Sequence, residues 1–153
     1  MTERASVDGT GDPIAWQLGQ FREFEIKVKV FIADSSDMIC QRLAHKLSEL
    51  EGVEIIGCAR DPNTALGEIG RLRPHVVLLD VHLFRGNGLE ILRKVKHEKW
   101  ALFVLMLTGD ASVKYHEKCA KAGADYILYK PNAPEKAKEI LSGLLDLLNS
   151  SGG

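Results

Sequence analysis

The stretch His75-Val76-Val77-Leu78-Leu79-Asp80 decides the fold of this chain. Four consecutive aliphatic residues without polar alternation are typical of a strand that is buried on both faces of a parallel sheet. Because the run ends in a carboxylate, we expect Asp80 at the carboxyl end of this strand, the edge at which open α/β sheets bind their ligands. Taken alone, such an Asp is more often a strand terminator or a helix N-cap than a reactive group.

Four other apolar runs predict the remaining strands, over residues 26–33, 53–59, 101–107 and 126–129. Polar residues directly follow three of these runs: Asp34 after the first, Thr108 after the third and Lys130 after the last. The carboxyl ends of parallel strands meet at one edge of a sheet, so we expect all three side chains near Asp80.

Helical patterns lie between the strands and after the last one. Ser35, Ser36 and Asp37 supply N-cap chemistry for the first helix, and Asp61-Pro62 places a capping Asp before a Pro at the first helical position. The alternation of strands and helices predicts a (βα)5 fold of the α/β class, a doubly wound parallel five-stranded sheet with helices on both faces. We expect the flavodoxin-like strand order 2-1-3-4-5, in which strands one and three flank the ligand-binding crevice.

A length of 153 residues and a hydrophobic content of 45% suffice for one domain. We place this domain at residues 26–149, after a flexible N-terminal extension at 1–25 and before a disordered tail at 150–153. The extension and its junction carry more apolar mass than a linker needs, in Ile14, Trp16, Leu18, Phe21 and Phe24. Two interpretations stay open: some of these side chains pack on the domain beside its first strand, or they contact a partner or a second copy.

Charge and cysteine usage limit the class of function. With 20 basic and 21 acidic residues, the net charge of -1 gives no electrostatic footprint for nucleic acid, so we expect a protein or small-molecule partner. No apolar run approaches the length of a membrane span. Cys40, Cys58 and Cys119 form no Cys-x-x-Cys pair and lie in apolar patterns, which indicates reduced core residues. We therefore expect a cytoplasmic protein that does not contact membranes.

Asp34, Asp80, Thr108 and Lys130 form a chemically coherent set. Two neighbouring carboxylates repel each other unless a cation lies between them, which favours a hard, oxygen-liking ion such as Mg²⁺. A hydroxyl and an ammonium beside a metal-bound carboxylate suit a dianionic phosphoryl group, because Lys neutralises charge and Thr donates a hydrogen bond. The set predicts a site that holds phosphate on Asp80.

Short fragments around these residues come in a characteristic order and spacing: Ile32-Ala33-Asp34-Ser35-Ser36, Pro74 through Asp80, Gly88-Leu89-Glu90, Leu107-Thr108-Gly109, Gly123-Ala124-Asp125 and Lys130-Pro131. With these fragments, the chain from about Val28 to Leu148 resembles the receiver domain of bacterial response regulators. The resemblance implies a two-component phosphorelay protein that is not an enzyme beyond its own phosphorylation and dephosphorylation. Asp80 would accept a phosphoryl group from a sensor histidine kinase or a phosphotransfer protein.

The resemblance also implies roles for the other site residues. Thr108 would be the switch hydroxyl, and Lys130 would pair with the phosphoryl group, with Gly109 beside them. The metal ligands would be Asp34, Asp80 and the backbone carbonyl of His82. The Lys130-Pro131 bond would be cis, as is usual in the family.

Signal output is expected by contact, because no DNA-binding or catalytic domain follows Leu148. The expected surface is a face of the fifth strand, with Tyr126, Ile127 and Tyr129 as candidates. It would bind a downstream protein or form a homodimer.

Four positions depart from the family pattern. Ser35 stands where a second acid is usual, Phe84 where a Pro is usual, and Asn87 where an Asp is usual. Ile127 stands where an aromatic residue commonly moves with the switch Thr. With one carboxylate fewer, we expect weak Mg²⁺ binding.

Two alternatives follow from these departures and from the fold. A pseudo-receiver would keep the fold as a protein-interaction module without phosphorylation, and the missing acid at Ser35 favours it. An enzyme is disfavoured, because haloacid-dehalogenase-type phosphatases need a second acid two residues after the nucleophile, where this chain has His82. A flavodoxin would need a phosphate-binding loop after strand one, and Asp34-Ser35-Ser36-Asp37 is too acidic for one.

Overall fold

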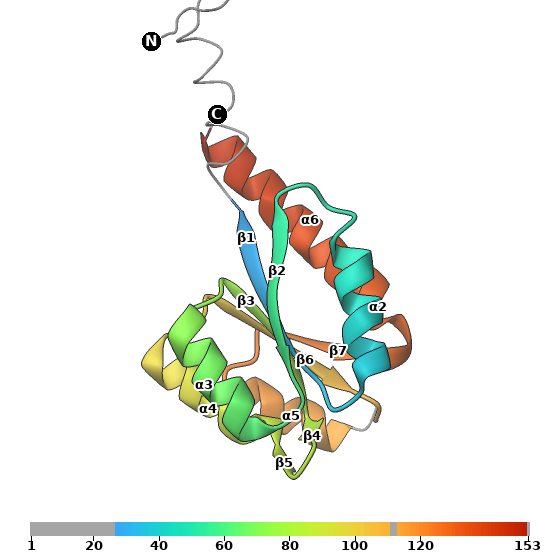
Figure 1. Cartoon of the computed structure of the whole chain (residues 1–153), viewed down its shortest axis with the longest axis vertical. Helices are drawn as coiled ribbons and strands as arrows, with labels where there is room; N and C mark the ends of the chain where they lie inside the picture. Colours follow the sequence, from blue (N-terminus) through green and yellow to red (C-terminus); the bar gives the residue numbers. More distant parts are fainter. Residues whose placement is uncertain (1–26, 111–112, 153) are drawn as a thin grey trace, which may run out of the picture.

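The five long strands form one parallel sheet in the order β2-β1-β3-β6-β7 (Figure 1). The structure is a computed structural model and describes residues 27–110 and 113–152. The sheet strands are β1 (Val28–Ala33), β2 (Val53–Ala59), β3 (Val76–Asp80), β6 (Phe103–Thr108) and β7 (Tyr126–Tyr129). The α/β class and the 2-1-3-4-5 order expected from the sequence are confirmed.

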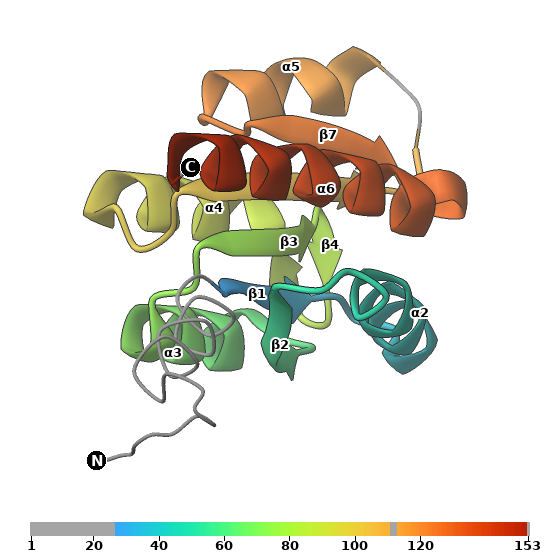
Figure 2. The ribbon, with the colours of Figure 1, turned by 90° about the horizontal axis from the view of Figure 1, so that it is seen from above.

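Helices cover both faces of the sheet (Figure 2). The helices are α2 (Asp37–Leu47), α3 (Pro62–Leu72), α4 (Gly88–Glu98), α5 (Val113–Lys121) and α6 (Ala133–Gly152), and a 3-10 turn, η1 (Lys130–Asn132), precedes the last. Buried side chains of α3, α4 and α5 share one hydrophobic cluster, and those of α2 and α6 share the other. The sheet is therefore the middle layer of three.

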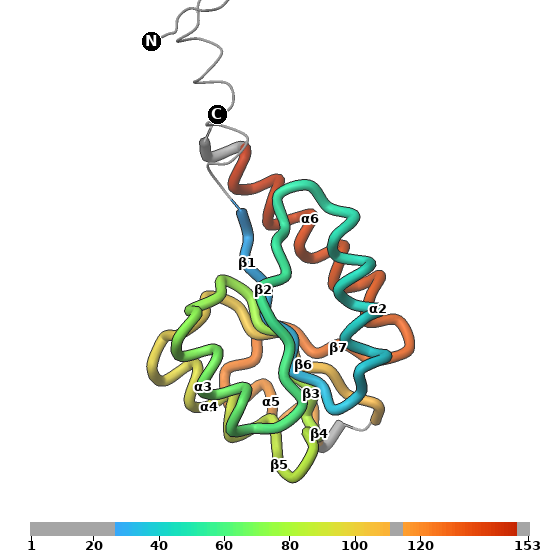
Figure 3. Tube along the Cα trace, viewed as in Figure 1, coloured from blue at the N-terminus to red at the C-terminus, as the bar shows by residue number. Residues whose placement is uncertain are grey.

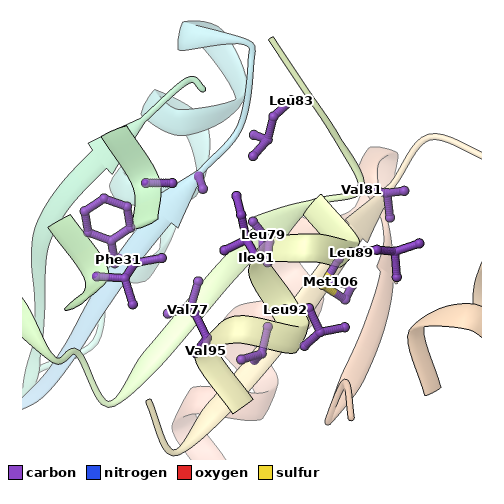
Figure 4. Packing of buried hydrophobic residues seen from close by; sticks show 14 of the residues in the cluster. Phe31, Val77, Leu79, Val81, Leu83, Leu89, Ile91, Leu92, Val95 and Met106 are labelled. Atoms are coloured by element: carbon purple, nitrogen blue, oxygen red, sulfur yellow. The ribbon is translucent and has the colours of Figure 1, made fainter. Parts of the chain in front are cut away.

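The central strand β3 explains this layering. All five of its residues are buried, and successive side chains of a strand point to opposite faces. Val77 and Leu79 belong to the α3-α4-α5 cluster, where they lie beside α4 (Figure 4). Val76 and Leu78 belong to the α2-α6 cluster instead. An uninterrupted apolar run is thus required, because both faces of this strand are covered.

Local capping fixes where the helices begin. The side chain of Ser36 accepts from the Ile39 N–H and caps α2, and Asp61 caps α3 ahead of Pro62 at its first turn. The Asn87 side chain caps α4 by accepting from the Leu89 N–H at 2.7 Å. Asn87, which departs from the family pattern, therefore has a structural role as a helix cap.

The connection after Asp80 has backbone pairing that the sequence analysis did not anticipate. It contains a short antiparallel hairpin, formed by β4 (His82–Leu83) and β5 (Gly86–Asn87). Arg85 at its tip has a φ of 61°, and the Phe84 N–H donates to Arg60 O at 3.0 Å. Two-residue strands are too short for a periodic pattern to reveal.

Other expectations need correction. The Lys130-Pro131 bond is trans, since the described residues contain no cis peptide bond, and the chain instead enters the 3-10 turn η1 at Lys130. Cys58 is exposed on the edge strand β2 and is not a core residue, whereas Cys40 and Cys119 are buried as expected. Helix α6 continues to Gly152, beyond residue 149, after which a disordered tail was expected.

The two ends of the strands lead to two different regions (Figure 3). The carboxyl ends of β1 and β3 lie toward the β4-β5 hairpin, and the start of β1 lies toward the end of α6. The apolar residues between Ile14 and Phe24 lie outside the described residues. Within those residues, no helix is long and apolar enough to cross a membrane.

Candidate functional site

Three of the four predicted site residues lie at strand ends and are buried: Asp34, Asp80 and Thr108 are 0%, 1% and 1% exposed. The fourth, Lys130, follows β7 and extends its ammonium to both carboxylates. Its Nζ lies 2.7 Å from Asp80 Oδ2 and 3.1 Å from Asp34 Oδ2. The fold thus brings residues that are far apart in sequence into a single charged cluster.

Asp80 is held at both of its carboxylate oxygens. Oδ1 accepts from the His82 N–H at 3.0 Å, and Oδ2 accepts from Lys130 Nζ at 2.7 Å. The His82 bond is an Asx-type contact that the tight turn after β3 provides. The carboxylate is therefore fixed in orientation and covered by the Lys130 side chain.

Asp34 is less completely satisfied. Its Oδ1 accepts from the Ser36 N–H at 2.9 Å, but Oδ2 has no hydrogen-bond partner among the described residues and only the ion pair with Lys130. Burial raises the pKa of Asp34, and the negative charge of Asp80 adds to this, while the Ser36 N–H and Lys130 oppose it. The buried Oδ2 is a carboxylate oxygen with capacity for a further cation.

Lys130 carries the compensating charge. Burial by itself would lower the pKa of Lys130, but the hydrogen bond and charge of Asp80, together with Asp34, outweigh burial and raise it. The ammonium is 21% exposed, so it stands between the carboxylates and solvent. One cation thus serves two anions, which leaves the cluster short of positive charge.

Thr108 has its hydroxyl turned to its own loop. Oγ1 accepts from the Asp110 N–H and donates to the Asp110 carbonyl, both at 3.0 Å. Gly109 follows, and a Cβ at this position would meet nothing within 4 Å. The space beside the Gly109 backbone is therefore open.

Gly88 supports the site in a way that sequence reasoning missed. A Cβ on Gly88 would overlap the backbone carbonyl oxygen of Asp80, and the Gly88 N–H donates to Val81 O at 2.8 Å. The start of α4 therefore presses directly on the end of β3, which only glycine permits. The fragment Gly88-Leu89-Glu90 pointed to this glycine, but the sequence did not show that it lies against the Asp80 carbonyl.

Ser35 does not cap the first helix, since Ser36 does so. Ser35 is half-buried, and its backbone carbonyl accepts from Arg60 Nε at 3.2 Å. The Arg60 guanidinium also lies 3.6 Å from Asp37 Oδ2. Sequence reasoning missed Arg60, because its partners Ser35 and Asp37 follow β1 whereas Arg60 follows β2. Only the pairing of these two strands brings them together.

The donor set fits a hard cation. Among the described residues, no group of three or more His, Cys, Asp and Glu side chains could hold a metal. Two carboxylates, Asp34 and Asp80, with the His82 carbonyl nevertheless offer the oxygen ligands that Mg²⁺ takes, with water filling its other positions. The buried Oδ2 of Asp34, which lacks a hydrogen bond, is the observation that supports this fit.

The candidate output residues lie on β7. Tyr126 is 48% and Tyr129 is 45% exposed, whereas Ile127 packs against the α3-α4-α5 cluster. A further aromatic contact, not anticipated from the sequence, joins the hairpin to α5: the His82 and Tyr115 rings meet edge to face with centroids 5.2 Å apart. The loop that follows Asp80 thus contacts α5, the helix that precedes the β7 strand.

Fold and site together define a class: a doubly wound parallel α/β protein with two buried carboxylates and one lysine at the point where the strand order reverses. Residues 30–142 match the response regulator receiver domain, so the chain belongs to that family. It is a receiver domain of two-component signal transduction, and receiver domains interact with histidine kinases.

Solved receiver structures agree. The signal receiver domain of the putative response regulator NarL from Mycobacterium tuberculosis has a TM-score of 0.71 at 22% identity, covering 78% of this chain and 96% of that one. The BeF3-activated receiver domain of DrrB, a Thermotoga maritima protein, has a TM-score of 0.69 at 27% identity, covering 79% and 99%. The fold of the chain is therefore that of a receiver domain.

Curated relatives are longer. A protein-glutamate methylesterase/protein-glutamine glutaminase of Syntrophus aciditrophicus is 25% identical over 128 residues, which are 83% of this chain but 37% of the relative. One from Shewanella oneidensis is 33% identical over 105 residues, which are 68% of this chain and 30% of the relative. The chain spans about a third of these relatives and matches them through the receiver part, so their esterase activity belongs to other domains.

Proposed function

We propose that this chain is a phosphoacceptor in a two-component phosphorelay and that Asp80 receives the phosphoryl group. The donor is the phosphohistidine of a sensor histidine kinase or phosphotransfer protein. The observation that supports the proposal best is the shared ammonium: Lys130 Nζ lies 2.7 Å from Asp80 Oδ2 and 3.1 Å from Asp34 Oδ2. A buried carboxylate pair with one counterion suits a site that takes up another cation and a phosphoryl group.

The transfer follows from this arrangement. A carboxylate oxygen of Asp80 attacks phosphorus, the bond from phosphorus to the donor imidazole breaks, and its electron pair returns to the imidazole nitrogen. Lys130 then pairs with a phosphoryl oxygen instead of the bare carboxylate. Asp34, Asp80 and the His82 carbonyl would hold Mg²⁺, and the bound ion would neutralise charge on the phosphoryl oxygens.

Two rearrangements accompany phosphorylation. Asp80 is 1% exposed, so the Lys130 side chain has to turn aside before a donor reaches the carboxylate. The Thr108 hydroxyl has to leave the Asp110 carbonyl before it donates to the phosphoryl group. Because Asp110 begins the connection to α5, this exchange gives the site a route to that helix and to the β7 face, where Tyr126 and Tyr129 are exposed.

A second candidate is a pseudo-receiver, a binding module that is not phosphorylated. Ser35 at the second-acid position favours it, because the site then has one carboxylate fewer for a metal. In both candidates the β7 face, with Tyr126, Ile127 and Tyr129, binds a downstream protein or a second copy.

Intact-mass measurement after treatment with acetyl phosphate and Mg²⁺ separates the two candidates. We expect one phosphoryl adduct that Asp80→Asn removes. Asp146→Asn, which changes an exposed Asp on α6 in the same way, is the matched control and keeps the adduct. An unmodified wild-type chain at saturating donor would favour the pseudo-receiver, and an adduct on Asp80→Asn would show that another residue is the acceptor.

Lys130→Ala tests the role of the cation. We expect a cooperative thermal transition, because Lys130 is not part of either hydrophobic cluster, together with loss of the phosphorylation-dependent change on the β7 face. Its midpoint should be lower than that of the wild type and should be raised by Mg²⁺, which replaces the lost charge between Asp34 and Asp80. A chain that fails to fold even with Mg²⁺ would make Lys130 a structural residue.

A further inference from the structure

An apolar groove lies at the end of the molecule opposite the phosphoacceptor site. It has a volume of about 390 Å³, and Val28 and Val76, at the starts of β1 and β3, contribute to its lining. Leu102, before β6, and Leu144, Leu147 and Leu148, on α6, also line it. Polar atoms contribute almost nothing to this surface.

The groove exposes leucines that a closed domain would cover. Leu102 and Leu147 are each 66% exposed, and Leu148 is 39% exposed. Single exposed apolar residues are ordinary, but here three large ones line the same groove. Leu144, Leu147 and Leu148 follow the i, i+3, i+4 spacing, so one stripe of α6 faces the groove. Such a continuous stripe indicates that something covers it.

The position of the chain entry indicates what covers the groove. Lys27, the first described residue, is itself part of the lining. The segment that precedes it in the sequence contains Ile14, Trp16, Leu18, Phe21 and Phe24, an apolar set that could supply the contacts an apolar groove needs. Each residue of chain spans at most about 3.5 Å, so Phe24 and Phe21 reach no farther than roughly 10 and 20 Å from Lys27.

We propose that residues 14–24 dock in the groove formed by the starts of β1, β3 and β6 and the end of α6. Tethering favours this segment over a separate molecule. A short linker gives the segment an effective concentration of about millimolar at the groove, which is higher than the usual concentration of a second protein copy. Docking removes Leu102 and Leu147 from water and leaves the phosphoacceptor edge and the β7 face open. The proposal is independent of whether Asp80 is phosphorylated.

Trp16 provides the measurement. In the full chain carrying Trp100→Phe, Trp16 is the remaining tryptophan, since the sequence has two. We expect its emission to be shifted to shorter wavelength, and its quenching by acrylamide to be several-fold weaker, than in a synthetic peptide of residues 10–27. Trp100 is outside the groove lining, so its replacement leaves the groove intact.

Two substitutions place the docking. Leu147→Asp on α6 and Leu102→Asp before β6 both change the groove lining, and each should return Trp16 to the behaviour of the peptide. Both positions are mostly exposed, so the fold is kept, as circular dichroism would verify. Asn149→Asp adds the same charge at an exposed position of α6 outside the groove lining and should change nothing.

Each other outcome would overturn the proposal. Trp16 quenched as strongly as in the peptide would show that the segment is not docked. Shielding that survives both Leu substitutions would place the segment elsewhere. Shielding that appears only as the concentration rises between about 1 and 100 µM would mean that a second copy, not the tethered segment, covers the groove.

Discussion

At the scale of single residues, the electrostatics of the site depend on Lys130. Its ammonium contacts Asp80 and Asp34 together, and the excess negative charge falls on the more poorly bonded of the two, Asp34. We expect this imbalance to attract cations to the site and to make the ionised form of Asp34 unfavourable for folding. Both consequences can be measured.

Asp34→Asn should stabilise the protein at neutral pH. Burial and the charge of Asp80 raise the pKa of Asp34, so the ionised carboxylate is disfavoured in the folded state. Asp34 therefore contributes most stability below its ordinary pKa of 3.8, where the carboxyl is neutral, and this contribution is lost as pH rises through the folded-state pKa. Asn is neutral throughout and still accepts from the Ser36 N–H. We expect a gain of about 1 kcal/mol near pH 7, or roughly 3 °C in Tm.

The pH dependence and the metal supply the controls. Below the ordinary pKa of Asp34 the wild-type carboxyl is neutral as well, so the two melting curves should converge on acidification. Added Mg²⁺ should raise the Tm of the wild type and leave that of Asp34→Asn nearly unchanged. A variant that is less stable than the wild type at pH 7 would mean that the ion pair with Lys130 outweighs burial.

Ser35→Asp should tighten Mg²⁺ binding. The described site has two carboxylates where the family pattern has three, and a supporting group at a metal site is commonly worth roughly 10 to 100-fold in affinity. Ser35 is not the helix cap, so its replacement leaves the start of α2 intact. Isothermal titration of Mg²⁺ measures the change.

Ser36→Asp is the matched control, because it adds the same charge one residue later and keeps an N-cap side chain. It should change Mg²⁺ affinity much less than Ser35→Asp does. Equal effects of the two substitutions would show that only the overall charge matters and that Ser35 does not occupy the second-acid position.

At the scale of elements, the junction between β3 and α4 sets the geometry around Asp80. The β4-β5 hairpin returns the chain so that Gly88 lies against the Asp80 carbonyl, while Asn87 caps the helix. The same tight turn positions the His82 N–H on Asp80 Oδ1. Helix start and acceptor carboxylate are thus parts of one packed unit.

Gly88→Ala should disrupt this unit. Its Cβ would overlap a backbone oxygen, which cannot move aside as a flexible side chain can. We expect a loss of about 2 kcal/mol, which corresponds to a fall of roughly 6 °C in Tm by thermal denaturation. Gly109→Ala is the control, because its Cβ would meet nothing within 4 Å, and its stability should stay close to that of the wild type. Similar losses for both variants would contradict the proposed overlap.

At the scale of the whole molecule, the two hydrophobic layers separate the cysteines. Cys40 is buried with α2 and α6, Cys119 is buried on the opposite face, and Cys58 is exposed on the edge strand. Cys40 and Cys58 nevertheless meet through a side-chain hydrogen bond, which is the main cause that lowers the pKa of the Cys58 thiol. The reactivity of the thiols therefore reports on the whole fold.

Thiol labelling should modify one cysteine rapidly in the native protein and all three after unfolding. Because the pKa of Cys58 is lowered, its labelling rate should reach half of its limiting value at a pH below the ordinary thiol pKa of 9.0. Cys40→Ala should move the pH of this midpoint upward. Mass spectrometry of the labelled peptides identifies the site. Rapid native labelling of Cys40 or Cys119 would contradict the described layering.

The sequence by itself determined the strands, their order and the residues at their ends. Runs such as Val76–Leu79 report burial on both faces, and caps such as Asp61 depend on neighbours in the chain, so both can be read locally. The same local reading located Asp34, Asp80, Thr108 and Lys130, and found Ser35 in place of a second acid. The family match confirmed the class of protein that these residues implied.

Only the tertiary structure decided how these residues meet. The sharing of Lys130 between two carboxylates, the turning of Thr108 to Asp110, and the hydrogen bond between Cys40 and Cys58 depend on distances between side chains that are set by packing. The trans Lys130-Pro131 bond and the exposure of Cys58 were likewise hidden from the sequence. Periodicity and capping depend on residues within one element, so the sequence shows them. Charge sharing and grooves depend on how different elements pack against one another, and sequence patterns do not give those positions to within an ångström.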